Sequence, residues 1–143
     1  MITRDFSASI QSYLESFSAI LVLGARQVGK TTLLKTLLKE THKYVLLEDP
    51  DTRELALNDP RTFFKTYPPP IIIDEFQHAP LLVNYLQGMI DNNRSLKGQF
   101  VLTGSQNFQM MNQVSQSLAG RIGILNLYGL SSTEIENNEK AWI

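Results

Sequence analysis

Apolar positions recur along the chain at two different periods, and the changes of period divide it into alternating elements. Near the N-terminus, Phe6, Ile10, Leu14 and Phe17 are three or four residues apart, which predicts an amphipathic helix. The run "SAILVLG" is short and apolar and ends in glycine, so it predicts a buried strand. In "GKTTLLKTLLKE" the leucines return to helical spacing, with lysines and a glutamate on the other face. A strand, a glycine-containing loop and a helix therefore follow one another.

The same alternation continues to the end of the chain. "KYVLLED" predicts a second strand, and "TRELALNDPRTFFKT" predicts two short helices separated at Asp59 and Pro60. "IIIDE" contains three consecutive β-branched residues and predicts a central strand buried on both faces. A helix is expected to start near Pro80, followed by a strand in "QFVLTGS", a helix in "FQMMNQVSQSL" and a fifth strand in "RIGILNLYGL". Strands alternating with helices indicate an α/β fold with a mostly parallel five-stranded sheet covered on both sides.

Composition restricts the class of protein further. The 143 residues fit one domain, 1–143, and 43% hydrophobic with 19% charged residues is typical of a soluble globular protein. No apolar run approaches the roughly 20 residues that span a bilayer, and nothing resembles a secretory signal, so we expect a cytoplasmic protein without membrane insertion. The absence of cysteine excludes disulfides and thiolate chemistry. A net charge of −1 gives no support to nucleic-acid binding.

The segment from Gly24 to Thr31 fits the pattern G-x-x-x-x-G-K-[ST] of a phosphate-binding loop, in the required setting between a strand and a helix. Glycines let backbone N–H groups point inward at a phosphate, and the helix N-terminus adds partial positive charge. Lys30 is expected at the β- and γ-phosphates, Thr31 at Mg²⁺ and Thr32 near the α-phosphate. A strand-to-helix turn with a solvated lysine is the alternative. The predicted nucleotide-binding residues are Gly24, Ala25, Arg26, Gln27, Val28, Gly29, Lys30, Thr31 and Thr32.

Two neighbouring acids end the strand in "IIIDE". Asp74 is placed to hold Mg²⁺, usually through water, opposite Thr31. Glu75 is then the candidate base that orients and deprotonates a water for attack on the γ-phosphorus, which favours hydrolysis over transfer to an alcohol. Ordinary acids at the end of a strand would look the same, but the phosphate loop upstream favours chemistry.

Further polar residues complete the candidate site. Thr103 and Ser105, with Asn107 behind them, are candidates for contact with the attacking water or the γ-phosphate, although turn-forming residues would look similar. Arg121, which opens the last strand, is a candidate for stabilising transition-state charge, in its own subunit or a neighbour's, and a surface salt bridge is the equal alternative. The two histidines, His42 and His78, lack partners at metal-ligand spacing and are expected to be solvated or structural.

Together, "GARQVGKTTLLK", "LEDPDTRELALNDPRTFF", "IIIDEFQHAP", "VLTGSQNF" and "SLAGRIGILNLYGLSSTE" resemble the N-terminal ATPase module of an uncharacterised family of prokaryotic AAA+-type P-loop ATPases. The resemblance covers nearly the whole chain. It implies a three-layer αβα, RecA-like sandwich with strand order 5-1-4-3-2, the cofactors ATP and Mg²⁺, and the same roles for Lys30, Thr31, Asp74 and Glu75. Members normally continue into a C-terminal domain, so this chain, ending at Ile143, resembles a fragment.

These observations lead to an expected function and to alternatives. The leading hypothesis is ATP binding with Mg²⁺-dependent hydrolysis, weak in a truncated form, and the main alternative is a nucleotide-binding switch or assembly module with little hydrolysis. Phosphotransfer to a small molecule would need an acceptor pocket and an arginine-bearing lid, and no motif in the sequence indicates either. A homo-oligomer is compatible with a role of Arg121 at a neighbour's nucleotide. Binding of nucleic acid would depend on a missing C-terminal domain.

Overall fold

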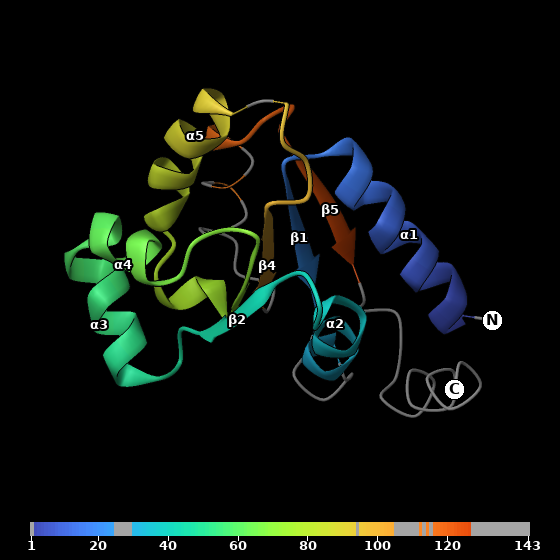
Figure 1. The fold of residues 1–143 in the computed structure, drawn as a ribbon, viewed down its shortest axis with the longest axis horizontal. Coiled ribbons are helices and arrows are strands. Elements are labelled where there is room, and N and C mark those ends of the chain that lie inside the picture. The colour runs from blue at the N-terminus through green and yellow to red at the C-terminus, as the bar shows by residue number, and fades with distance from the viewer. Residues whose placement is uncertain are drawn as a thin grey trace.

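The computed structural model describes residues 2–24, 30–93, 95–104, 112, 114 and 116–126, with side chains from residue 7 onward. These residues form a five-stranded parallel sheet in the order β2-β3-β4-β1-β5, which confirms the predicted α/β class and, read from the other edge, the order 5-1-4-3-2 (Figure 1). The strands are β1 (Ala19–Leu23), β2 (Lys43–Leu46), β3 (Ile71–Asp74), β4 (Phe100–Gly104) and β5 (Ile122–Asn126).

Helices cover both faces of the sheet and make three layers. One face carries α1 (Ile2–Ser16) and α2 (Lys30–Leu38), and the other carries α3 (Pro50–Asn58), α4 (Pro60–Thr66) and α5 (Leu82–Asn92) (Figure 1). A short 3₁₀ helix, η2 (Phe76–His78), follows β3 directly. Because every crossover runs between parallel strands, the carboxyl ends of all five strands lie at one edge of the sheet.

Successive side chains along a strand point to opposite faces of the sheet, and helices cover both faces. In β1, Ile20 and Val22 pack with α1 and α2, whereas Ala19, Leu21 and Leu23 pack with the opposite helices, and all five are fully buried. A central strand of a parallel sheet is buried on both faces, so neither face needs polar side chains. The apolar run in "SAILVLG" is therefore the direct sequence signature of this position.

Local signals set most of the helix boundaries. Asp49 and Asp59 cap α3 and α4 by accepting backbone N–H groups, and a proline occupies the first turn of each helix, so the predicted break at Asp59 and Pro60 is confirmed. The helix expected near Pro80 begins two residues later, because the N–H groups of residues 82–84 bond to carbonyls three residues back and form a tighter turn first.

The C-terminal predictions are tested only in part. In the helix predicted from "FQMMNQVSQSL", residues 112, 114, 116 and 117 are helical, and the remaining described residue, Leu118, follows them as a bend. Residues 127–130 of the predicted fifth strand lie outside the described part of the chain. Among the helices described, none combines the length and apolarity that crossing a bilayer requires.

Helix α1 packs so closely on β5 that one strand residue must lack a side chain. A Cβ at Gly123 would lie 2.5 Å from Cδ2 of Tyr13 and 2.7 Å from Cδ2 of Phe17. We expect Gly123→Ala to destabilise the protein by about 1–3 kcal/mol, because overpacking forces the helix away from the strand. The midpoint of urea unfolding measures the effect.

A second glycine serves as the control. Gly88, within α5, has no atom within 4 Å of a Cβ placed on it. Gly88→Ala is expected to leave stability unchanged or to raise it by up to about 1 kcal/mol through the better helix propensity of alanine. If the two substitutions shift the midpoint equally, the close approach of α1 to β5 is wrong.

Candidate functional site

The carboxyl ends of β1, β3 and β4 meet the first turn of α2 at one edge of the sheet. Gly24 follows β1, and its N–H donates to the carbonyl of Gly104 at the end of β4, 3.2 Å away. Asp74 ends β3 and lies next to this junction because β4 pairs with both β1 and β3. The sheet therefore brings the predicted acids to the segment that the sequence identifies as a phosphate loop.

Asp74 is held by three hydroxyl groups from three different elements. Thr31 Oγ1, from α2, donates to Asp74 Oδ2 over 2.9 Å. The hydroxyl of Tyr44, from β2, donates to the same oxygen, and Thr103 Oγ1, from β4, donates to Oδ1. Only 3% of Asp74 is exposed, so these donors replace the water that a carboxylate would otherwise bind. They also fix the direction in which the carboxylate points.

The donor set around Asp74 fits Mg²⁺. Thr31 gives its hydroxyl proton to Asp74, which leaves the lone pairs of Oγ1 free to bind a cation. Mg²⁺ prefers oxygen ligands and is usually held by one or two carboxylates together with substrate phosphates and water. Within the described residues, no three His, Cys, Asp or Glu side chains gather as a metal site. The residues thus suit a metal that is bound jointly with a phosphate-bearing substrate.

Glu75 adopts a left-handed backbone conformation, with φ 59° and ψ 51°. A non-glycine residue in this region costs about 1–3 kcal/mol and persists only where the surroundings impose it. Here the N–H of Glu75 donates to Thr103 Oγ1 over 3.1 Å, and Phe76, which is fully buried, anchors the next position. The turn sends the Glu75 side chain toward α2.

Lys30 and Glu75 form a buried ion pair. Lys30 Nζ lies 3.5 Å from Glu75 Oε1, and the exposed fractions of the two side chains are 1% and 6%. Lysine is almost never fully buried without a partner, because an unpaired ammonium loses its hydration. The position of Lys30 in the first turn of α2 therefore requires negative charge nearby, which Glu75 supplies in this structure and a polyphosphate could also supply.

The structure describes some of the remaining predicted residues and not others. Thr103 is fully buried beneath the two acids, and its contact with water or phosphate stays a prediction. Thr32 is exposed in the first turn of α2. Residues 25–29 of the loop, together with Ser105 and Asn107, lie outside the described part of the chain.

Arg121 is not part of this cluster. It precedes β5, and β5 pairs with β1 so that Ile122 faces Ala19, which places Arg121 at the amino edge of the sheet. Its Nε lies 2.7 Å from Asp91 Oδ1, and one of its terminal nitrogens lies 3.4 Å from Asp91 Oδ2. Of the alternatives for Arg121, the structure shows the surface salt bridge, and because a residue before a parallel strand lies at the edge opposite to the phosphate loop, it does not place Arg121 near a nucleotide in its own subunit. Action in a neighbouring subunit stays a prediction.

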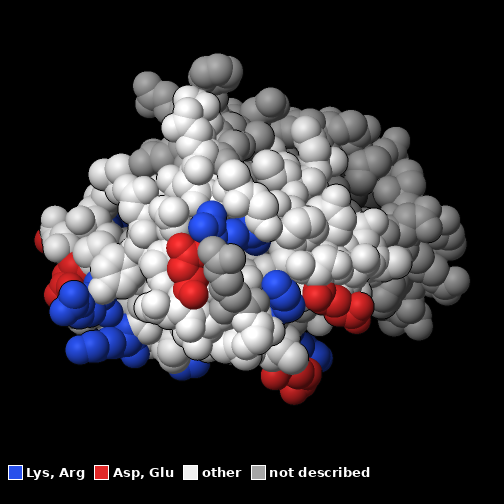
Figure 2. Space-filling view, turned by 90° about the horizontal axis from the view of Figure 1, so that it is seen from above, with Lys and Arg blue, Asp and Glu red and all other residues white. Residues whose placement is uncertain are grey.

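The amino edge of the sheet carries charges of both signs. Figure 2 looks onto this edge and shows basic and acidic side chains side by side among the described residues. Interspersed charges of this kind favour local ion pairs over a continuous field that would attract phosphate backbones. This arrangement agrees with the near-neutral charge of the chain.

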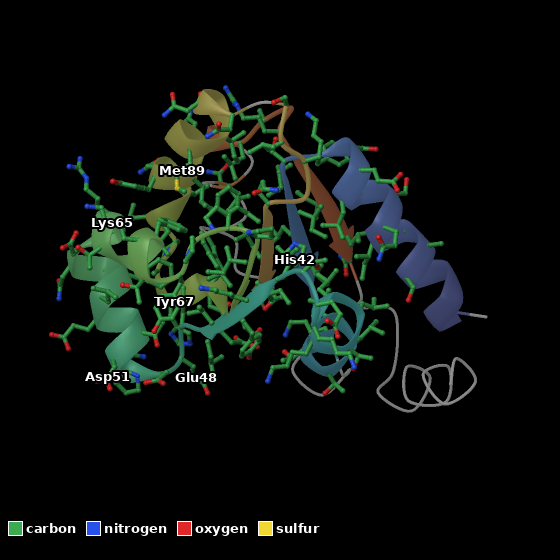
Figure 3. The ribbon with its side chains drawn as sticks, viewed as in Figure 1. His42, Glu48, Asp51, Lys65, Tyr67 and Met89 are labelled. Carbon is green, nitrogen blue, oxygen red and sulfur yellow. The ribbon has the colours of Figure 1, made fainter. Side chains whose placement is uncertain are left out.

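His42 has a structural role, as expected. Its Nε2 lies 2.8 Å from the carbonyl oxygen of Gly98 and must donate to it, and its Nδ1 lies 2.7 Å from the Thr41 hydroxyl. Burial lowers the pKa of the His42 imidazole, which favours this neutral form. Figure 3 shows His42 and Glu48 at opposite ends of β2, with Glu48 and Asp51 toward the carboxyl edge.

Two residues of the site were not predicted from the sequence. Tyr44 lies inside β2, and its contact with Asp74 depends on the pairing of β2 with β3, which no local pattern reveals. Gln77 donates from Nε2 to Glu75 Oε2. A signal for Gln77 was present, since "DEFQ" places a polar residue two positions after Glu75, but no role was assigned to it.

Comparisons with known proteins agree with the fold. Uncharacterized proteins of Mycobacterium tuberculosis and Mycobacterium bovis are each 28% identical to this chain over 142 residues, which is 98% of this chain and 32% of theirs. The chain thus spans about a third of the length of these curated relatives. A solved structure, the Walker-type ATPase of Pyrococcus abyssi, matches with a TM-score of 0.55 and 16% identity over 95% of this chain and 61% of its own, which shows a shared fold. Residues 16–136 match the AAA domain family, so the resemblance to an AAA-type module is confirmed and this chain belongs to the AAA domain family.

Proposed function

We propose that this domain binds ATP together with Mg²⁺ and hydrolyses the bond to the γ-phosphate. The observation that carries the proposal is the meeting of Lys30, Thr31, Asp74 and Glu75 at the carboxyl edge of one parallel sheet. In AAA-type domains such an edge is where a nucleotide is expected. The family and the fold support an ATP-binding, ATPase-like module, and the division of roles below is our proposal.

Lys30 provides the positive charge for the phosphates. Its ammonium is buried at the N-terminus of α2, where the helix dipole also favours an anion. When phosphate oxygens approach, the ammonium can exchange its contact with Glu75 for charge-assisted hydrogen bonds to them. Binding of substrate would in this way separate the carboxylate of Glu75 from Lys30.

Thr31 and Asp74 would hold the metal. The free lone pairs of Thr31 Oγ1 and the carboxylate of Asp74 are hard oxygen donors on the same side of the β3–α2 junction. A bound Mg²⁺ supplies neutralisation of the charge that develops on the β- and γ-phosphate oxygens. Tyr44 and Thr103 keep Asp74 in one orientation, so the site is arranged before the metal arrives.

Glu75 is the proposed base. Its carboxylate lies one residue beyond the metal-binding acid and next to the lysine that binds phosphate, so it can accept a proton from a water that attacks in line. Asp74 is less suited to this role, because a carboxylate that is engaged with the metal cannot easily accept a proton from water.

A nucleotide-binding switch with little hydrolysis is the second candidate. The observation that favours it is the position of Arg121, which is paired with Asp91 at the edge opposite to Lys30 and cannot stabilise transition-state charge in its own subunit. In P-loop enzymes an arginine supplied by a partner accelerates hydrolysis by about 10³ to 10⁵. A domain that depends on a neighbour for this group would turn over slowly when alone.

Phosphate release from ATP, measured with Mg²⁺ and with EDTA over a range of protein concentrations, tests both candidates. The hydrolase proposal expects Mg²⁺-dependent release, and specific activity that rises with protein concentration would indicate a residue supplied in trans. Tight binding of an ATP analogue without phosphate release would favour the switch. Labelled phosphate that appears on an organic acceptor would contradict both, and added DNA or RNA tests coupling to nucleic acid.

A further inference from the structure

Glu75 is held at both of its carboxylate oxygens. Lys30 Nζ lies 3.5 Å from Oε1, and Nε2 of Gln77 donates to Oε2. The contact with Lys30 is one that a bound polyphosphate would compete for, since Lys30 is the proposed phosphate ligand. The contact with Gln77 involves no group in the proposed phosphate or metal site, so it would persist when substrate binds.

The backbone explains why Gln77 reaches Glu75. The left-handed conformation of Glu75 reverses the chain into η2, whose first residue, Phe76, is fully buried against the sheet. The N–H of His78 donates to the carbonyl of Glu75 over 3.2 Å and closes the turn. The turn thus places the side chain of Gln77, two residues later in the sequence, next to the side chain of Glu75.

The carboxylate dictates the orientation of the Gln77 amide. A carboxylate can only accept hydrogen bonds, so the amide must present its N–H₂ group and direct its carbonyl oxygen elsewhere. That oxygen, Oε1, is buried and has no hydrogen-bond donor among the residues that the structure describes.

From this geometry we infer that Gln77 is a positioning residue for the base, holding the Glu75 carboxylate in place after Lys30 has turned to the phosphates. The inference rests on the proposed function, since it gives Gln77 a purpose only if Glu75 acts on water. Gln77 acts through Glu75 and contributes nothing to the binding of nucleotide or metal.

Gln77→Met keeps the length of the side chain and removes the amide. We expect kcat for ATP hydrolysis to fall about tenfold, the effect of losing one hydrogen bond to a charged group. The KM for ATP and the affinity for a non-hydrolysable ATP analogue should stay within twofold of the unsubstituted protein. Gln77→Asn, which retains an amide on a shorter chain, should recover part of kcat, and it provides a second variant if methionine perturbs folding.

Two comparisons separate positioning from a general structural role. Gln99→Met makes the same change in a glutamine at the amino edge, whose Nε2 donates to the carbonyl of Lys97, and it should leave kcat unchanged. In a Glu75→Gln background, single-turnover measurements should show no further loss from Gln77→Met, because a residue that acts through Glu75 has nothing left to position.

The outcomes distinguish this inference from the proposed function. If the unsubstituted protein hydrolyses ATP and Glu75→Gln does not, but both Gln77 variants retain full kcat, the inference is overturned and the proposed function stands. A tenfold loss that persists in the Glu75→Gln background, or an equal loss of analogue binding, would also overturn it. If the unsubstituted protein releases no phosphate at all, the proposed function fails first.

Discussion

Lys30→Ala is expected to abolish ATP binding. The substitution removes the ammonium that is buried in the first turn of α2 and proposed to bind the β- and γ-phosphates. One or two charge-assisted hydrogen bonds are lost, each worth about 1.5–3 kcal/mol, which corresponds to a decrease in affinity of about 10²-fold or more. Titration with a fluorescent ATP analogue measures the loss.

The same substitution also removes the contact between Lys30 and the Glu75 carboxylate. Removing one member of a buried ion pair can destabilise a protein by about 3–5 kcal/mol, although the 3.5 Å separation here favours the lower end. Thermal unfolding should therefore be recorded beside the titration, and Lys30→Met, which retains most of the side-chain volume, should lose binding with a smaller loss of stability.

Lys39 provides the matched control for Lys30. It is exposed immediately after the end of α2, so Lys39→Ala removes the same charge from the same region without touching the cluster. Its affinity for the analogue should stay within twofold of the unsubstituted protein. If Lys30→Ala also binds within threefold, the loop does not bind phosphate in the manner proposed.

Glu75→Gln is expected to bind ATP normally and to lose turnover. The amide has nearly the same size as the carboxylate but cannot accept a proton from water, so kcat should fall by about 10²- to 10⁴-fold, the usual contribution of a general base. Phosphate release under saturating ATP and Mg²⁺ gives kcat, and the analogue titration gives affinity. Loss of the charge next to Lys30 should leave that ammonium free for phosphate and keep affinity at least unchanged.

The exposed Glu54 of α3 is the control for Glu75. Glu54→Gln makes the same chemical change on the surface and should retain full turnover. Equal turnover by Glu75→Gln and the unsubstituted protein would remove Glu75 as the base, and attention would then pass to residues outside the described part of the chain.

The sequence allowed the architecture to be predicted because the strands of a parallel sheet are apolar on both faces. Runs such as "AILVL" and "IIID" differ from the helical spacing of the leucines in α2, so the succession of elements could be read directly. The acids could be predicted for a related reason, because residues that directly follow parallel strands must gather at the carboxyl edge.

The site features that were not predicted depend on tertiary structure. Tyr44 reaches Asp74 only through the pairing of two strands that are distant in sequence. The left-handed turn at Glu75 has no glycine, the residue that usually indicates such a conformation in a sequence. The alternatives left open for Arg121 could have been narrowed from the sequence, because a residue that precedes a parallel strand lies at the opposite edge from one that follows it.

Thr103 in β4 forms hydrogen bonds with both Asp74 and Glu75. Its oxygen accepts the N–H of Glu75 and donates its proton to Asp74, so a small displacement of the end of β4 would disturb both hydrogen bonds at once. The proposed metal binding and the proposed water activation would then be mechanically coupled through one side chain. Any partner that pulls on the chain just beyond Gly104 would switch both functions together, and could not adjust one without the other.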